Sequence, residues 1–195
     1  MITLPTTIEE MTKDMLECEQ TQGQSVYQHG ESVQNHFFEL INGQLNGWRI
    51  PKWLSENPQV TSNIYDVETI KDYTLYHDCG KPYCRIVDAD GRTHFPNHAE
   101  VSGDLWMNIS GDEMVGFLIK NDMLIHTATA DEISSFLESC STKDILTLLI
   151  VSLCEIHSNA KMFGGIDSNS FKSKWKKIDR RGNQIVKHLK EKNAI

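Results

Sequence analysis

Residues 144–160, with the sequence DILTLLIVSLCEIHSNA, form a strongly apolar segment that decides the fold class. The segment is too long for a typical strand, and its apolar residues lie on most sides of a helix, as in a helix buried at the centre of a protein. Thr142 is expected to open this helix. Leu153 and His157 are four residues apart and share a face, so the imidazole is predicted to point toward the core.

Helical periodicity and capping signals predict further helices on both sides of this segment. Residues 46–65 are expected to be a connection with one short helical turn, and residues 84–95, CRIVDADGRTHF, a small hairpin or extended loop around an Asp-Gly turn. The predicted fold is all-α, a single helical bundle of about six to seven helices with a short irregular or hairpin insert near residues 84–96. The helices other than the apolar one are expected at about residues 6–20 (with a capping box at Thr6 or Thr7), 25–45, 66–80, from 97, from 112 and from 170.

The dipeptide His77-Asp78 is expected to lie in the last turn of one of these helices. Asp66 is expected to cap the start of that helix, and Gly80 followed by Pro82 is the usual signal for its end.

Two more helices are expected to carry candidate functional residues. Asn97 and Glu100 are predicted to cap the first, which places His98 in its first turn. The second is predicted to start at about Asp112 and to carry Asp122 near its end.

The composition is that of an ordinary globular domain. The chain has 195 residues with 39% hydrophobic and 24% charged residues, and one domain is the default for this length. It has no run of about 18 apolar residues and no secretory signal, so we expect a soluble cytoplasmic protein without a membrane partner. Five cysteines in no disulfide or zinc spacing indicate reduced thiols, with Cys79 and Cys84 as packed thiols.

The net charge of −8 is unevenly distributed along the chain. Residues 171–195 carry nine Lys/Arg against Asp179 and Glu191, a net charge of +7, which leaves −15 for residues 1–170. This basic terminal helix is either a surface for phosphate groups or the solvated face of a helix.

The candidate metal ligands are histidines and carboxylates without paired thiolates. Such ligands suit Mn, Fe, Co, Ni or Zn in a reactive site better than a structural zinc site. A shared carboxylate can bridge two ions about 3.5–4 Å apart that activate a water, which predicts hydrolytic chemistry. A lone core histidine, however, is usually only hydrogen-bonded. The candidates, each on a predicted helix near apolar positions, are His29, His77, Asp78, His98, Asp122 and His157.

Residues 75–103, LYHDCGKPYCRIVDADGRTHFPNHAEVSG, with His29 upstream, carry a family resemblance. They resemble the HD-domain superfamily of metal-dependent phosphohydrolases, most closely the HD domain of bacterial CCA-adding tRNA nucleotidyltransferases. The strongest parts are HDCGKP, the following acidic-Gly turn and HFPNHAE. The resemblance implies a single HD domain over residues 1–195, with a core at about 25–160 and a basic C-terminal helix at about 170–192.

The resemblance also implies a ligand set. His29, His77 and Asp78 correspond to ligands of the first metal, with Asp78 also in a catalytic role. The sequence departs from the family at the fourth position, where His157 stands in place of an Asp. A second metal would correspond to His98 and Asp122, although Asp122 has the alternative interpretation of a plain helix-end carboxylate. The implied cofactor is a divalent metal, two ions of Mn, Fe, Co, Ni, Mg or Zn.

Other assignments stay open. His36 lies seven residues after His29 on the same predicted helix and is the alternative ligand. Lys81 is expected to act in catalysis by holding a substrate phosphate, or else to be a cation at a helix C-terminus. His94 and His126 are surface groups or contacts to substrate.

The resemblance predicts a metal-dependent phosphohydrolase (phosphodiesterase or phosphomonoesterase) acting on 2′,3′-cyclic phosphates or 2′-phosphates of nucleotides or RNA ends. No nucleotidyltransferase domain is seen upstream, so tRNA end synthesis is not expected. Residues 155–165, EIHSNAKMFGG, are similar to HD proteins of RNA repair, including those of bacteriophages. The partner would then be a nucleotide or an RNA 3′ end, in the host cytoplasm if the protein is phage-encoded, and a homo-oligomer stays open.

Two other functions stay open as well. One is a nucleotidase, or a phosphohydrolase of nucleoside triphosphates or cyclic nucleotides. The other is a non-catalytic nucleotide-binding HD module, which the departure at His157 keeps open.

Overall fold

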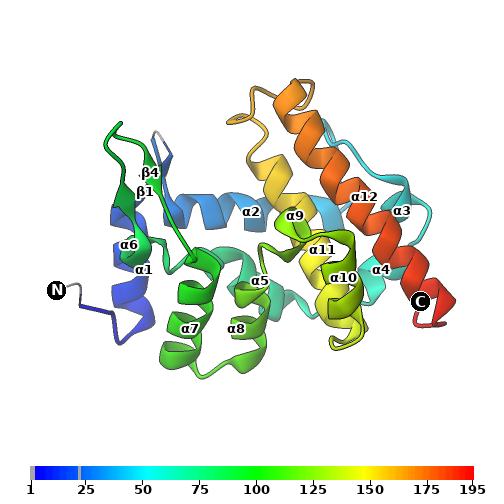
Figure 1. Ribbon diagram of the computed structural model, residues 1–195, viewed down its shortest axis with the longest axis horizontal. Coiled ribbons are helices and arrows are strands. Elements are labelled where there is room, and N and C mark those ends of the chain that lie inside the picture. The colour runs from blue at the N-terminus through cyan, green and yellow to red at the C-terminus, as the bar shows by residue number, and fades with distance from the viewer. Residues whose placement is uncertain (1–2, 22) are drawn as a thin grey trace. The chain divides into compact units, whose positions relative to one another are not determined.

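The computed structural model describes residues 3–21 and 23–195, which form mostly helices and two small antiparallel sheets (Figure 1). The predicted all-α class is confirmed. The helices of eight or more residues include those expected from the sequence, and four-residue helices add to them. The helices are α1 (Ile8–Glu17), α2 (Val26–Ile41), α3 (Lys52–Ser55), α4 (Gln59–Ser62), α5 (Val67–Tyr76), α6 (Lys81–Cys84), α7 (His98–Ser110), α8 (Glu113–Lys120), α9 (Leu124–Thr127), α10 (Ala130–Leu137), α11 (Thr142–Ser158) and α12 (Asn169–Glu191). The strands are β1 (Glu19–Thr21), β2 (Gln24–Ser25), β3 (Ile86–Val87) and β4 (Thr93–His94).

The described chain divides into two compact units. The first unit comprises the described residues up to Ser32 together with Glu68–Asp122, and the second comprises Val33–Val67 and Met123–Ile195. Each unit is described by itself below. The expectation of a single domain over residues 1–195 stays a prediction.

In the first unit, α1 starts after Thr7, one of the two residues predicted to cap it. The Oγ1 of Thr7 accepts a hydrogen bond from the backbone N–H of Glu10 at 3.2 Å. The carboxylate of Glu10 in turn accepts the backbone N–H of Thr6 at 2.8 Å. The second bond reaches the residue before the N-cap, so only half of the predicted capping box is formed. Helix α1 buries Met11 and Met15.

The segment around His77-Asp78 differs from the prediction. Helix α5 ends at Tyr76, so the His-Asp pair lies in the turn between α5 and α6 instead of in the last turn of a helix. Pro82 does not follow a stop but lies in the first turn of α6. A proline is tolerated there because the first-turn N–H groups have no partner within the helix.

The hairpin predicted near residues 84–96 is confirmed. Strands β3 and β4 pair antiparallel, with Ile86 opposite His94, and Gly91 in the turn has a φ of 78°. The expected cap of α7 is wrong in one detail: Asn97 has a φ of 54° and its side chain makes no capping hydrogen bond. A side-chain cap needs an extended N-cap backbone, which Asn97 does not adopt.

Helices α7 and α8 pack side by side after this hairpin (Figure 1). The start of α8 is as predicted, because the carboxylate of Asp112 accepts the backbone N–H groups of Met114 and Val115 at 3.0 Å each. Asp122 lies two residues beyond the end of α8 instead of within it.

In the second unit, α11 is the buried helix that the apolar segment predicted. It starts at Thr142 after a capping box between Ser141 and Asp144, and residues 145–154 are buried without interruption. Helix α12 packs alongside it (Figure 1). The connection of residues 46–65 holds two short helices, α3 and α4, where one turn was expected, and α3 buries Trp53.

Among the described residues, no helix combines the length and the apolar composition that crossing a membrane requires.

Candidate metal centre

The carboxylate of Asp78 is the centre of a cluster of histidines in the first unit. Its side chain is 1% exposed. The Nε2 atoms of His77 and His29 lie 3.2 and 3.7 Å from its Oδ2, and the Nε2 of His98 lies 3.6 Å from its Oδ1. The ammonium of Lys81 lies 2.6 Å from Oδ2. The structure therefore brings together His29, His77, Asp78 and His98 of the predicted ligand set.

A close approach of α2 to α5 places two of these histidines side by side. Gly30 lies against the main chain of Leu75, and a Cβ at Gly30 would come within 2.2 Å of the Leu75 carbonyl oxygen. Only glycine allows this spacing. The adjacent His29 consequently meets His77 with ring centroids 5.2 Å apart, and ligand atoms of the two lie within 4.8 Å of each other.

A second close approach holds the His-Asp turn against α7. The backbone N–H of Gly80 donates to the Oγ of Ser102 at 2.8 Å, and the thiol of Cys79 donates to the Ser102 carbonyl at 3.4 Å. A Cβ at Gly80 would lie 2.5 Å from the Ser102 nitrogen, so a larger residue would push the turn away. This contact keeps Asp78 near His98 at the start of α7.

Two of the imidazoles are oriented as metal ligands usually are. The Nδ1 of His77 lies 2.9 Å from the carbonyl oxygen of Thr74, and the Nδ1 of His98 lies 2.9 Å from that of Phe95. A carbonyl oxygen only accepts, so Nδ1 carries the proton and donates in both rings. In the neutral ring the Nε2 lone pair then faces Asp78. Metal-binding histidines commonly donate one ring N–H to a backbone carbonyl and bind the metal through the other nitrogen.

The donor atoms of the cluster suit a metal cation. Burial alone would raise the pKa of Asp78, but the nearby Lys81 ammonium holds this pKa well below its usual range. Asp78 is therefore a buried carboxylate anion, and the Nε2 atoms of His77 and His98 face it. Imidazole nitrogens and carboxylate oxygens are ligands of divalent metals, so a divalent metal fits this set of residues. Burial raises the pKa of the Cys79 thiol, which stays protonated and outside the donor set.

Asp122 belongs to the same unit and is also buried. Its Oδ1 accepts a hydrogen bond from the hydroxyl of Tyr73 at 2.6 Å. Its role as a ligand of a second ion stays a prediction.

His157, the predicted replacement for the family's Asp, lies in the second unit among aromatic rings. Its imidazole stacks on Trp48 with centroids 4.2 Å apart and meets Phe171 edge-on at 5.2 Å. Burial lowers the pKa of His157 to about 4, so the ring is neutral at pH 7. These contacts are those of a core histidine, and a metal role for His157 stays a prediction.

The remaining candidates are placed as follows. His36, the alternative to His29, lies in the second unit with its ring 5.6 Å from that of Trp48. His94 is on the exposed hairpin, where its Nε2 lies 2.8 Å from an oxygen of Asp88. Lys81 is not at a helix C-terminus but begins α6, and its ammonium contacts Asp78 as described above.

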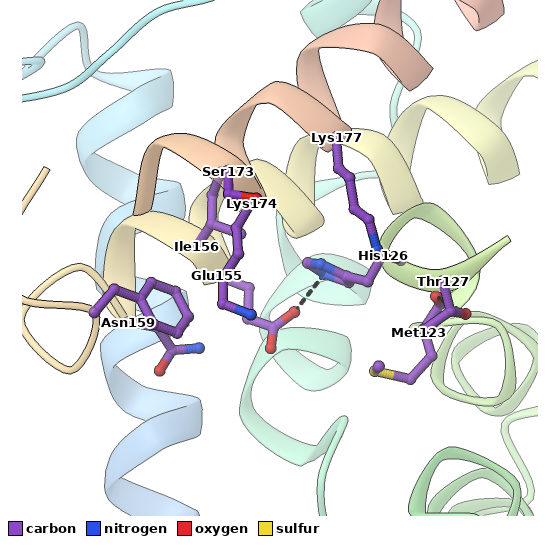
Figure 2. A pocket seen from close by; sticks show the side chains of 10 residues that line it. Met123, His126, Thr127, Glu155, Ile156, Asn159, Ser173, Lys174 and Lys177 are labelled. Atoms are coloured by element: carbon purple, nitrogen blue, oxygen red, sulfur yellow. Dashed lines mark hydrogen bonds and ion pairs between the residues drawn. The ribbon is translucent and has the colours of Figure 1, made fainter. Parts of the chain in front are cut away.

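The residue that sequence analysis missed is Glu155 on α11. In the second unit its carboxylate lies 2.7 Å from the Nε2 of His126 (Figure 2). The available signal was its position: it is a carboxylate inside an otherwise apolar helix, two residues before His157. Such a residue needs a partner.

Comparison of the chain with models of known protein families gives no match, and comparison with curated proteins gives none either. The resemblance to HD domains therefore stays a prediction from the motifs quoted above.

Proposed function

We propose that the chain is a metal-dependent phosphohydrolase that acts on 2′,3′-cyclic phosphates or 2′-phosphates of nucleotides or RNA ends. The observation that carries the proposal is the placement of three imidazole Nε2 atoms within 3.2–3.7 Å of one buried carboxylate. A divalent cation, when bound, polarises a phosphoryl group and increases the acidity of a water, which is the chemistry that hydrolysis needs.

The residues of the chain have distinct parts in this proposal. His29, His77 and Asp78 would hold the first ion, and His98 would be a ligand of the second ion. The backbone carbonyls of Thr74 and Phe95 fix the tautomers of His77 and His98. The Nε2 lone pairs therefore point toward Asp78, and neither Nε2 has to lose a proton before it binds a metal. A second ion would take Asp122 in addition to His98.

Lys81 has a separate part. Its ammonium offsets the charge of Asp78, and its side chain is only 11% exposed. It also lies over the ring of Phe95, 5.4 Å from the centroid. With Asp78 engaged as a metal ligand, the Lys81 ammonium would be available to a substrate phosphate.

The first test measures metal content and hydrolysis together. Purified protein is assayed for bound metal, and phosphate release is followed with Mn²⁺, Co²⁺, Ni²⁺ or Mg²⁺ on 2′,3′-cyclic nucleotides, 2′-nucleotides and nucleoside triphosphates. His77→Ala should lower metal content and abolish turnover. His188→Ala is the control, because this histidine of the second unit lies 3.8 Å from Glu138 and outside the cluster.

The outcomes separate the candidate functions. Turnover of cyclic or 2′ substrates that needs His77 supports the proposal. Turnover of triphosphates alone replaces it with a nucleotide phosphohydrolase. Bound metal without any turnover leaves a non-catalytic module, and full activity of His77→Ala refutes the site.

A further inference from the structure

A pocket of about 360 Å³ lies wholly within the second unit (Figure 2). Residues of α9, α11 and α12 and of the segment after α11 line it. The volume is at the lower end of the range of about 300–1,000 Å³ for small-molecule sites. It therefore suits a small ligand better than a polymer.

Two lysines of α12 line this pocket. Lys174 and Lys177 are three residues apart and therefore share a face of the helix. On the same helix, Lys172 lies 3.8 Å from Asp167 and Lys192 lies 2.8 Å from Glu138. Within residues 3–21 and 23–195, neither Lys174 nor Lys177 lies within 4 Å of a carboxylate oxygen.

Weak contacts position both ammonium groups at the pocket. The Nζ of Lys177 donates to the carbonyl oxygen of His126 at 3.4 Å. The Nζ of Lys174 lies over the ring of Phe163, 4.9 Å from its centroid. The one carboxylate in the lining, Glu155, is paired with the imidazole of His126 at 2.7 Å, so the two lysines leave the pocket positively charged.

The rest of the lining combines hydrogen-bonding and apolar groups. Asn159 and Ser173 supply an amide and a hydroxyl, and Met123, Ile156 and Phe163 supply apolar surface. Figure 2 shows Lys177 and His126 together on one side and Asn159 on the other. The lysines suit an anionic group of a ligand, and the apolar side chains next to them suit a flat ring. A nucleotide combines a phosphate and a flat base in this way.

We infer that this pocket binds a phosphate monoester of mononucleotide size, with the phosphate on Lys174 and Lys177 and the base against Phe163 and Ile156. Binding in this pocket does not depend on the proposed hydrolysis, and every residue that lines the pocket belongs to the second unit.

Isothermal titration of the full chain with adenosine 2′-monophosphate tests the inference, in the presence of a chelator so that no hydrolysis occurs. Lys174→Gln and Lys177→Gln should each weaken binding about tenfold, as expected for loss of one charged hydrogen bond. Lys176→Gln is the matched control, because it removes the same charge from an exposed neighbouring position outside the lining and should change the affinity less than about twofold. Adenosine should bind much more weakly than the phosphate ester.

Several results would overturn the inference. One is absence of binding at millimolar ligand, and another is equal affinity for adenosine and its 2′-monophosphate. A third is an equal loss of affinity in Lys176→Gln and in the two pocket variants, which would indicate attraction by diffuse surface charge. Tight binding of a single-stranded RNA that depends equally on all three lysines would replace the pocket with an RNA surface. Failure of phosphate release with nucleotide binding retained would refute the proposed function and leave this inference intact.

Discussion

The ion pair of Asp78 and Lys81 allows the structural and functional roles of the cluster to be separated. Its atoms are 2.6 Å apart, which corresponds to a gross attraction of about 6 kcal/mol at an effective dielectric of about 20. Asp78→Asn leaves the Lys81 ammonium with no carboxylate partner among the described ion pairs. Removing one partner of a buried pair costs about 3–5 kcal/mol, a large part of a typical total stability of about 5–15 kcal/mol.

A double-mutant cycle measures this coupling. Urea unfolding followed by circular dichroism, in chelator, gives the free energy of unfolding of the wild type, Asp78→Asn, Lys81→Met and the double variant. The double variant should recover at least about 2 kcal/mol relative to the sum of the single changes, because no unpaired buried charge remains. It should still bind no metal and show no turnover, since the carboxylate is absent.

Three results would contradict these expectations. A loss of less than about 1 kcal/mol in Asp78→Asn would mean that the lysine finds solvent, and additive single changes would mean that the pair is not coupled. Metal content retained in the double variant would show that Asp78 is not a ligand.

Two further predictions concern Gly30 and His157. Gly30→Ala places a Cβ 2.2 Å from the Leu75 carbonyl oxygen, so overpacking should lower the free energy of unfolding by about 1–3 kcal/mol and should also lower the metal content. Thermal unfolding and metal analysis measure the two effects. An unchanged melting temperature would contradict the close approach. The pKa of His157 is about 4 in the folded chain and 6.5 ordinarily, so its stabilisation is complete above pH 6.5 and is lost as the pH falls toward 4. Between pH 7 and pH 4, the free energy of unfolding in chelator should therefore fall by about 3 kcal/mol less in His157→Phe than in the wild type. Identical dependence of this free energy on pH in both proteins would show that His157 is not a neutral core residue.

The sequence predicted those parts of the fold that depend on local signals. Apolar periodicity located α11 to its first residue, the capping pattern at Thr6 or Thr7 predicted the start of α1, and α8 begins next to Asp112 as expected. The boundaries at His77-Asp78 were wrong because Gly80 and Pro82 signal a helix end and a new helix start equally well. The conformation of Asn97 follows from how the hairpin connects to α7, and no local capping rule reports that.

The candidate site divides in the same way. The motif HDCGKP and the spacing to His98 identified residues that the structure brings within 3.7 Å of one carboxylate. The sequence did not reveal Glu155, whose pairing with His126 depends on how α9 packs on α11. Contacts between side chains of different elements depend on packing, and a single sequence carries no direct signal for them.

The metal cluster depends on glycines as much as on ligands. His29 is 48 positions from His77, and His98 is a further 21 positions along the chain, so three separate segments must meet at one carboxylate. At Gly30 the helix α2 touches the main chain of α5, and at Gly80 the turn touches the main chain of α7. Gly30 is one residue from His29, and Gly80 is two residues from Asp78. A substitution at either glycine is therefore expected to disable metal binding while every ligand remains in the sequence. Metal binding thus requires these two glycines as well as His77 and Asp78.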